Sequence, residues 1–233
     1  MNKSKNTQIK VGIILICLVL VGTLFQPASG RGVEQNNNEG IGNSMVYLPM
    51  LRKSSPFRIS RVSVSSEGLQ GNAESTLPDI SNDGRYVVFS SFADNLVPGD
   101  TNGQSDVFVQ DRQTAQTVRG SVASDGTQGN ERSGYYGNSS ISADGRYVAF
   151  ASAANNLVGN DTNNRDDIFV HDRHTGQTRI VSLASDGTQG NNWSLSPSIS
   201  RWSVHAFVSY ATNLVNGDTN AETDVFVHNQ QTD

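Results

Sequence analysis

The sequence is poor in cysteine, and its single cysteine, Cys17, lies in an apolar run near the start. One thiol cannot form an intramolecular disulfide, and cysteine-based zinc sites need several thiolates. If the run is removed as a targeting segment, the mature chain has no thiol at all. The sequence therefore excludes a disulfide framework, a cysteine-based zinc site and a cysteine nucleophile, and it predicts a fold stabilised by packing alone.

Aromatic and charged side chains are also sparse, at 7% and 17% of the residues, and the formal net charge is −5. A mildly acidic chain offers no electrostatic attraction to phosphates, so nucleic acid and anionic membrane surfaces are excluded as partners. After residue 30 no stretch repeats apolar residues at the helical period of 3.6. Abundant Gly, Ser, Asn, Asp and Thr instead favour short strands joined by many turns.

The N-terminal region has the pattern of a targeting segment. Basic residues precede the uncharged apolar run from Val11 to Phe25, and small residues follow at Ala28 and Gly30. This order predicts a secretory signal peptide over residues 1–30 and a secreted, extracellular or periplasmic protein. The alternative is an uncleaved anchor formed by the run itself, which is short for a membrane span of about 20 apolar residues. Residues 31–56 are expected to be a flexible linker.

The most informative feature present is a unit that occurs three times. Its first landmark, Ile-Ser-x-Asp-Gly-Arg-Tyr-Val-x-Phe, is followed by a second, Asp-Val/Ile-Phe-Val. The first begins at Ile80 and Ile141 and, in altered form, at Ile199; the second begins at Asp106, Asp167 and Asp224. The landmarks are 61 residues apart between the first two copies and 57 or 58 between the last two. A period of this length is typical of propeller blades.

Each repeat is expected to contain four short strands, named a to d here. Asp83-Gly84 and Asp144-Gly145 stand between strands a and b, where Asp-Gly is a strong signal for a tight hairpin. Strand a is the segment that ends at Ile80, Ile141 or Ile199; strand b covers 85–91, 146–152 and 204–210; strand c covers 106–110, 167–171 and 224–228; strand d covers 117–122 and 178–183.

An extra copy of strand d is expected at the start, from Phe57 to Val64, because this segment aligns with the two later copies of that strand. The order is then d, abcd, abcd, abc, and the leading strand is expected to complete the last sheet. The predicted fold class is all-β, with three propeller-type blades of four antiparallel strands. The repeat region is 57–233, divided near 57–116, 117–177 and 178–233.

These two landmarks together resemble the TolB-like β-propeller repeat, a relative of the WD-type repeats. The resemblance covers residues 57–233 and implies a propeller fold in a periplasmic or extracellular setting, with protein or ligand binding as the usual role. It implies no reaction, because this fold carries many functions. The chain departs from the family in having only three repeats, a longer connection between strands b and c, and a third hairpin without Asp-Gly.

The connection between strands b and c carries the main candidate for chemistry. In each copy oxygen-bearing side chains stand at positions 1, 3 and 7 of the loop, and calcium prefers such ligands. No copy has a further acid to act as a bidentate ligand, so the alternative is that these side chains hold a turn. The candidate calcium ligands are Asp100, Asn102 and Asp106, then Asp161, Asn163 and Asp167, then Asp218, Asn220 and Asp224.

For partner binding, the candidates are the aromatic residues Tyr135, Tyr136 and Trp193, which stand in loops where they can be exposed. No catalytic residue is predicted, because no unique cluster of acids, His and Tyr and no Gly-x-Ser-x-Gly motif is present. The predicted function is therefore a non-enzymatic scaffold for a protein or an extracellular ligand. The alternatives are a calcium-binding structural module and, more distantly, a propeller-based glycan hydrolase or lyase.

Three repeats are fewer than a closed propeller of this family contains. Either two copies of the chain complete a ring, or the chain is a fragment of a longer gene product. The first alternative predicts a homo-oligomer.

Overall fold

The computed structural model describes residues 58–200 and 204–229. The predicted signal segment, the linker and the altered third hairpin at residues 201–203 lie outside this range. Within it the protein is all-β, since every regular element is a strand. The described residues contain no helix that is long and apolar enough to cross a membrane.

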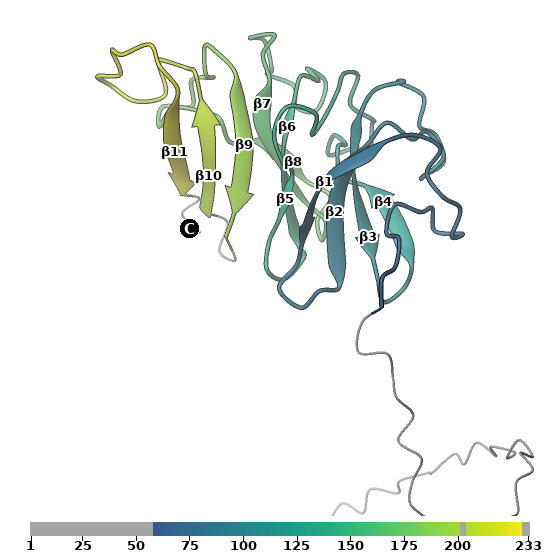
Figure 1. Ribbon diagram of the computed structural model, residues 1–233. Helices are drawn as coiled ribbons and strands as arrows, with labels where there is room; N and C mark the ends of the chain where they lie inside the picture. Colours follow the sequence, from purple (N-terminus) through teal and green to yellow (C-terminus); the bar gives the residue numbers. More distant parts are fainter. Residues whose placement is uncertain (1–57, 201–203, 230–233) are drawn as a thin grey trace, which may run out of the picture. The chain divides into compact units, whose positions relative to one another are not determined.

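The strands form three antiparallel sheets that follow one another along the chain (Figure 1). Two sheets have four strands and the third has three, each in chain order. The first comprises β1 (Ser75–Ile80), β2 (Tyr86–Ser91), β3 (Asp106–Asp111) and β4 (Gln116–Arg119). The second comprises β5 (Ser140–Ile141), β6 (Tyr147–Ser152), β7 (Asp167–Asp172) and β8 (Thr178–Ile180), and the third β9 (Ser194–Ile199), β10 (Val204–Ser209) and β11 (Asp224–Asn229).

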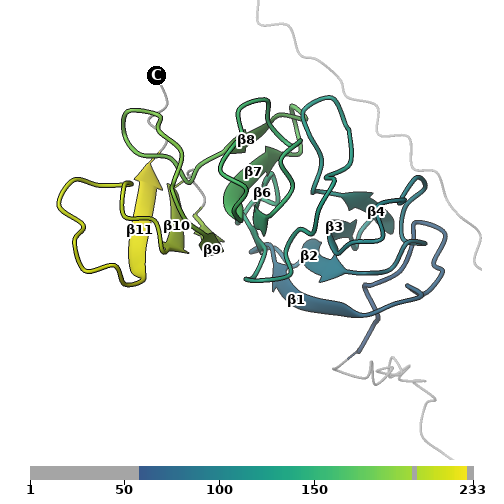
Figure 2. The ribbon, with the colours of Figure 1, turned by 90° about the horizontal axis from the view of Figure 1, so that it is seen from above.

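All three sheets belong to one compact unit of the chain. They spread like blades from β1, β5 and β9, with β4, β8 and β11 at the outside, so that the first and third sheets lie on opposite sides of the second (Figure 2). This confirms the predicted class of propeller-type blades. Strands b and c match their predicted bounds within one residue, and the three a strands end at the predicted isoleucines.

The leading strand d is the prediction that fails. Residues 58–63 form no strand, and Val64 makes only an isolated bridge to Gln70. In the first two sheets strand d pairs with the preceding strand c. The described part of the leading segment has no such strand beside it, because β11 lies at the far end of the row of sheets (Figure 1). A sequence with strand propensity stays irregular when no partner satisfies its backbone.

The Asp-Gly hairpins form as predicted. Asp83 accepts hydrogen bonds from Ser81 Oγ at 2.6 Å and from the amide of Arg85 at 3.0 Å. Gly84 follows with φ of 70°, in the left-handed region that glycine adopts without strain. The second copy repeats these contacts through Asp144. This hairpin turns the chain directly from strand a into strand b and so fixes the register of the sheet.

Two of the three core clusters lie between neighbouring sheets, and the third lies against the first sheet alone. Val107 and Val109 of β3 pack with Phe150 of β6 and Phe169 of β7, and all four are fully buried. A second cluster joins β7 to the third sheet in the same way. Because each blade covers the face of its neighbour, every residue of β3 and β7 is buried, whereas the residues of β11 alternate between half-buried and exposed.

Candidate functional site

The loop between strands b and c is held by hydrogen bonds within the protein. In the first repeat Gln128 Nε2 donates to Asp100 Oδ1 at 3.0 Å and to Asp106 Oδ2 at 3.1 Å. Ser121 Oγ donates to the other oxygen of Asp106 at 2.6 Å. Asn102 also turns its amide nitrogen, not its oxygen, toward Asp106. The three predicted ligands, Asp100, Asn102 and Asp106, are therefore donors and acceptors in one hydrogen-bond network.

The second repeat builds the same network with Gln189. Its Nε2 donates to Asp161 Oδ1 and Asp167 Oδ2, both at 2.9 Å, and Ser182 Oγ donates to Asp167 Oδ1 at 2.6 Å. Asn163 donates to Asp167 at 2.8 Å. Burial raises the pKa of Asp167 to about 6, even though Ser182 and Asn163 oppose the shift. Burial likewise raises the pKa of Asp106.

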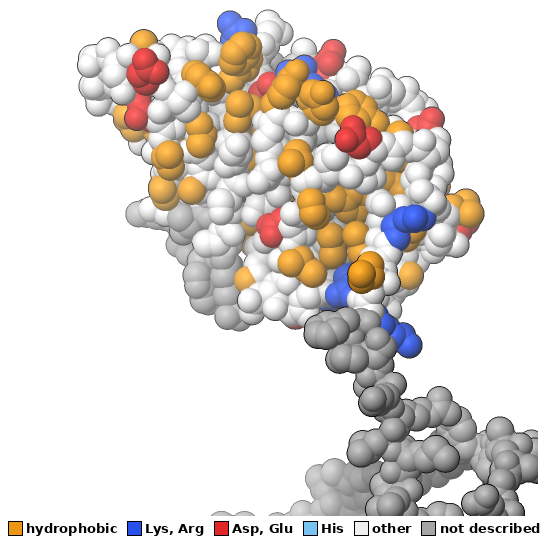
Figure 3. Space-filling model, viewed as in Figure 1, with side chains coloured by type: hydrophobic (Ala, Val, Ile, Leu, Met, Phe, Trp, Pro, Cys, Tyr) orange, Lys and Arg blue, Asp and Glu red, His pale blue; other side chains and the backbone are white. Residues whose placement is uncertain are grey.

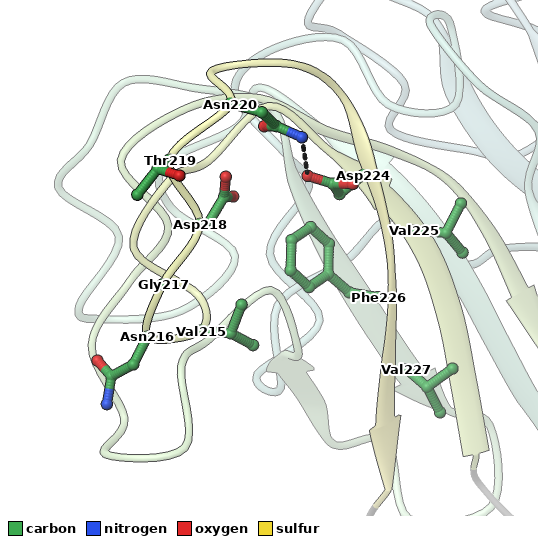
Figure 4. A pocket seen from close by; sticks show the side chains of 10 residues that line it. All are labelled: Val215, Asn216, Gly217, Asp218, Thr219, Asn220, Asp224, Val225, Phe226 and Val227. Atoms are coloured by element: carbon green, nitrogen blue, oxygen red, sulfur yellow. Dashed lines mark hydrogen bonds between the residues drawn. The ribbon is translucent and has the colours of Figure 1, made fainter.

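The third loop is less complete. Asn220 Nδ2 lies 3.5 Å from Asp224 Oδ2, and Asp218 Oδ1 is buried without a hydrogen-bond partner among the described residues. Figure 4 shows Asp218, Asn220 and Asp224 around an open pocket that Phe226 and Val215 also line. No glutamine equivalent to Gln128 or Gln189 reaches this loop in the described part of the chain.

Calcium binding by these loops stays a prediction, and the geometry favours the turn. Across residues 58–200 and 204–229, no three His, Cys, Asp or Glu side chains are grouped to hold a metal ion. In the first two loops both oxygens of Asp106 and Asp167, and one oxygen each of Asp100 and Asp161, already accept protein hydrogen bonds. We expect the thermal unfolding midpoint to stay unchanged in millimolar calcium relative to chelator, because no oxygen cage is open to bind it. A rise of the midpoint that saturates with calcium would show that the loops are metal sites.

An insertion in the second repeat creates the most exposed aromatic pair. Tyr135 and Tyr136 stand between Ser133 and the short strand β5, where the first repeat runs directly into β1. Gly134, with φ of 70°, passes so close to the first sheet that a Cβ atom there would overlap the side chains of Ser90 and Val107. Ser90 Oγ also donates to the carbonyl of Gly134 at 3.0 Å. The insertion is thus fixed against the neighbouring blade.

This placement brings Tyr135 beside Phe92 of the first repeat. Their rings meet edge to face with centroids 5.4 Å apart, and Tyr135 meets Tyr136 in the same manner at 4.6 Å. Arg132 lies over the ring of Tyr136 at 4.8 Å and forms an ion pair with Asp166 at 3.0 Å. Burial raises the pKa of Asp166, while the Arg132 guanidinium opposes the shift.

The contacts continue into the third repeat. Arg165, next to Asp166 in the chain, lies over the ring of Trp193 at 5.5 Å. Trp193 in turn meets Tyr210 edge to face, with centroids 6.3 Å apart. Two groups of contacts, joined by the chain bond between Arg165 and Asp166, therefore cross all three repeats. We call it the aromatic stripe and define it as Phe92, Arg132, Tyr135, Tyr136, Arg165, Asp166, Trp193 and Tyr210.

All five aromatic rings of the stripe are between 41% and 55% exposed. Such side chains present apolar area to a partner and are already held by their neighbours, so that binding loses little side-chain entropy. More generally, on the face drawn in Figure 3 hydrophobic side chains lie in groups, with single charged side chains between them. Tyr, Trp and Arg are the residue types enriched at the energetic centres of protein interfaces.

The structure thus joins the predicted partner residues Tyr135, Tyr136 and Trp193 through arginines that were not predicted. Phe92 and Tyr210 were also missed. They occupy the same place in the repeat, directly after strand b, where the second repeat has Ala153. Aligning the repeats on their constant residues would have revealed this variable aromatic position.

The loops that follow strand d, residues 124–130 and 185–191, carry the acidic residues Asp125 and Asp186, and both form turns. Asp125 accepts a hydrogen bond from the amide of Thr127 at 2.8 Å, and Asp186 from that of Thr188 at 2.9 Å. These bonds lower the pKa of both carboxyl groups. The carboxylates are therefore used within their own loops.

Comparison with known proteins gives only distant likenesses. No family model matches the chain, and no curated protein matches it. The solved structures that resemble it include a putative TolB from Agrobacterium tumefaciens, at 14% identity and a TM-score of 0.38, over 66% of this chain and 50% of that one. The β-propeller domain of the Trilobed protease from Pyrococcus furiosus is 15% identical with a TM-score of 0.34, over 67% of this chain and 44% of that one.

A structure of prolyl endopeptidases is also similar, at 13% identity and a TM-score of 0.41, over 67% of this chain and 20% of that one. The chain thus spans half or less of the length of each of these proteins. Likenesses at this level assign neither a family nor an activity. The propeller-type fold is established by the three blade-like sheets themselves.

Proposed function

We propose that this protein is a non-enzymatic, propeller-type scaffold, secreted or surface-tethered, that binds another protein through the aromatic stripe. The observation that carries the proposal is the continuity of the stripe. Five exposed rings and two arginines from three separate repeats form two groups of contacts, which the ion pair of Arg132 with Asp166, the chain neighbour of Arg165, joins. Packing of the fold does not require these rings to be exposed, whereas a binding surface does.

The proposed location follows from the N-terminal pattern of basic residues, apolar run and small residues. Membership of the TolB-like repeat family is part of the same proposal, and it is supported by the two landmarks that recur in order. Protein binding outside the cytoplasm is the usual role that this resemblance implies. A propeller-based hydrolase or lyase is the alternative, and it differs in an observable way, because an enzyme converts its ligand whereas a scaffold releases it intact.

The test is capture of a partner from extracellular or periplasmic extract by immobilised protein, followed by measurement of Kd with the purified partner. We expect the double variant Tyr135→Ser, Tyr136→Ser to weaken binding about 30-fold or more, since even one hot-spot residue contributes about 2 kcal/mol. The matched control is Val118→Ser, which removes an equally exposed apolar side chain from β4, outside the stripe.

Unchanged affinity in the tyrosine variant, or an equal loss in the tyrosine variant and the control, would place the binding surface elsewhere. Recovery of the partner in chemically altered form would favour the enzymatic alternative.

A further inference from the structure

The third sheet has an open edge at β11. In the described part of the chain β11 pairs only with β10, whereas β3 and β7 each pair on both sides. Val225 and Val227 are 74% and 62% exposed, while their counterparts in β3, Val107 and Val109, are fully buried. Figure 4 shows these two valines pointing to the opposite side of β11 from Phe226. Such an edge is a template for another strand.

The leading segment, residues 58–72, lacks the partner that β11 could supply, because it occupies the place of a strand d but has no strand c beside it in the described part of the chain. Its second half is folded like the segments that follow strand d in the first two sheets. Val64 bridges Gln70 as Val122 bridges Gln128. Thr117 Oγ1 donates to the carbonyl of Val64 at 2.6 Å, as Thr178 Oγ1 does to that of Val122. The segment therefore sits on the first sheet as a strand d of a preceding blade would sit.

The first half of this segment is exposed and unpaired. Residues 58–61 are all exposed, and the apolar side chain of Ile59 is completely so. The segment is thus placed to receive a strand c, and none lies beside it in the described part of its own copy. Figures 1 and 2 place it and β11 at opposite ends of the row of sheets, so one copy cannot join them.

The side chains at the two open ends are complementary in charge and in hydrogen bonding. In the first sheet Arg119 lies 3.2 Å from Asp100 and 3.4 Å from Asp106. Alignment of the repeats gives Arg61 as the counterpart of Arg119, and Asp218 and Asp224 as counterparts of the two acids. Arg61 instead donates to Gln70 at the surface, at 2.6 Å, and Asp218 Oδ1 is buried with no hydrogen-bond partner among residues 58–200 and 204–229.

Two further hydrogen-bond donors of the leading segment have counterparts in the first sheet. Ser63 is the counterpart of Ser121, which donates to Asp106, and Gln70 is the counterpart of Gln128, which donates to Asp100 and Asp106. The leading segment thus carries a donor for each acceptor that the third loop leaves open. The match is more specific than the pairing of any strand with an open edge, because the leading segment has partners in the third loop between strands b and c as well as along β11.

We propose that residues 58–72 of a second copy of this chain complete the third sheet. The contact is head-to-tail, and it joins β11 of each copy to the leading segment of the other. Two copies with three sheets each then close a ring of six blades, as heterologous contacts do when their rotation closes. The proposal is independent of the aromatic stripe and of any partner bound there.

The first test is the mass in solution of the full chain with charge-reversal variants. We expect the wild-type chain to be a dimer. Arg61→Asp or Asp218→Arg alone should weaken the dimer at least tenfold in Kd, and the double variant, which restores opposite charges, should recover it. Cooperative unfolding of each single variant confirms that it is folded. A monomer at every concentration, an open-ended series of larger masses, or a dimer that neither single variant weakens would overturn the proposal.

The second test traps the contact covalently. Ile59 and His228 correspond to Thr117 and Gln110, which face each other as a non-hydrogen-bonded pair of β4 and β3, a geometry in which the Cα atoms approach closely enough for a disulfide. In a Cys17→Ser background, Ile59→Cys with His228→Cys should give a disulfide-linked dimer on a non-reducing gel. The control pair, Tyr136→Cys with His228→Cys, should stay monomeric on the gel. Equal crosslinking of the two pairs, or none, would contradict the head-to-tail contact.

Discussion

Replacement of Phe169 by alanine is expected to lower the free energy of unfolding by about 4 kcal/mol, the usual loss for a fully buried phenylalanine. Phe169 of β7 is completely buried in the cluster between the first and second sheets. It stacks on Phe150 with ring centroids 5.9 Å apart. Its removal leaves a cavity that both sheets line, and neither sheet can close it without shifting the other.

The matched control lies at the same place in the third repeat. Phe226 of β11 stacks on Phe207 in the same way, at 5.8 Å, but it is only half-buried. Phe226→Ala should therefore lower the free energy of unfolding by about half as much, about 2 kcal/mol. Urea unfolding at a protein concentration that keeps the chain monomeric measures both. Equal losses would mean that the third sheet is as enclosed in solution as the second.

Replacement of His205 by valine is expected to stabilise the protein, and to do so more strongly at acid pH. His205 of β10 is completely buried, and neither ring nitrogen has a hydrogen-bond partner among the described residues. The first two repeats have Val87 and Val148 at this position, both buried. Valine therefore fits the site and removes two unsatisfied polar atoms, which cost about 1 to 3 kcal/mol when buried.

The pH dependence follows from the charge that His205 cannot carry in the folded state. Burial, together with smaller contributions from the nearby Arg179 and His228, lowers the pKa of His205 to about 4. The unfolded chain binds this proton near pH 6.5 and the folded chain only near pH 4. Folding stability is therefore lost as the pH falls from 6.5 to 4, by about 3 kcal/mol in total from this group.

The measurement is the unfolding midpoint of the wild-type chain and the His205→Val variant between pH 7 and pH 4. The difference between them should widen as the pH falls. The raised pKa of Asp167 acts in the opposite sense in both proteins, so it cancels in the difference. His174→Gln is the control, because it removes an exposed histidine. A constant difference across this range would show that His205 takes up its proton without opposing the fold.

Local sequence was sufficient to predict those parts of the fold in which a short motif determines a turn or a strand by itself. Asp-Gly at residues 83–84 and 144–145 fixed both hairpins, because glycine alone adopts the required φ without strain. The apolar strands b and c could be placed almost to the residue, since their apolar runs are bounded by turn residues on both sides. The leading segment has strand propensity but forms no strand, because no described strand lies beside it to pair with its backbone.

In the candidate site, too, local sequence predicts single residues, whereas tertiary packing decides which of them lie together. Tyr135, Tyr136 and Trp193 could be selected as exposed aromatics, but nothing local connects them, because Trp193 is nearly 60 residues further along the chain. Packing of the second blade between its neighbours brings Arg132 and Arg165 into place and so links the rings. Phe92 enters only because the chain at Gly134 approaches the first sheet closely.

The sequence by itself determined the repeat, and through it the all-β class, the strand order within each blade and the turns between strands. These are local matters, settled by side-chain periodicity and by the φ angles that particular residues adopt. The tertiary structure decided which faces stay uncovered, namely the aromatic stripe and the edge of β11. Exposure depends on what lies beside a strand or ring in space, and residues of one repeat do not specify how the next repeat will cover them.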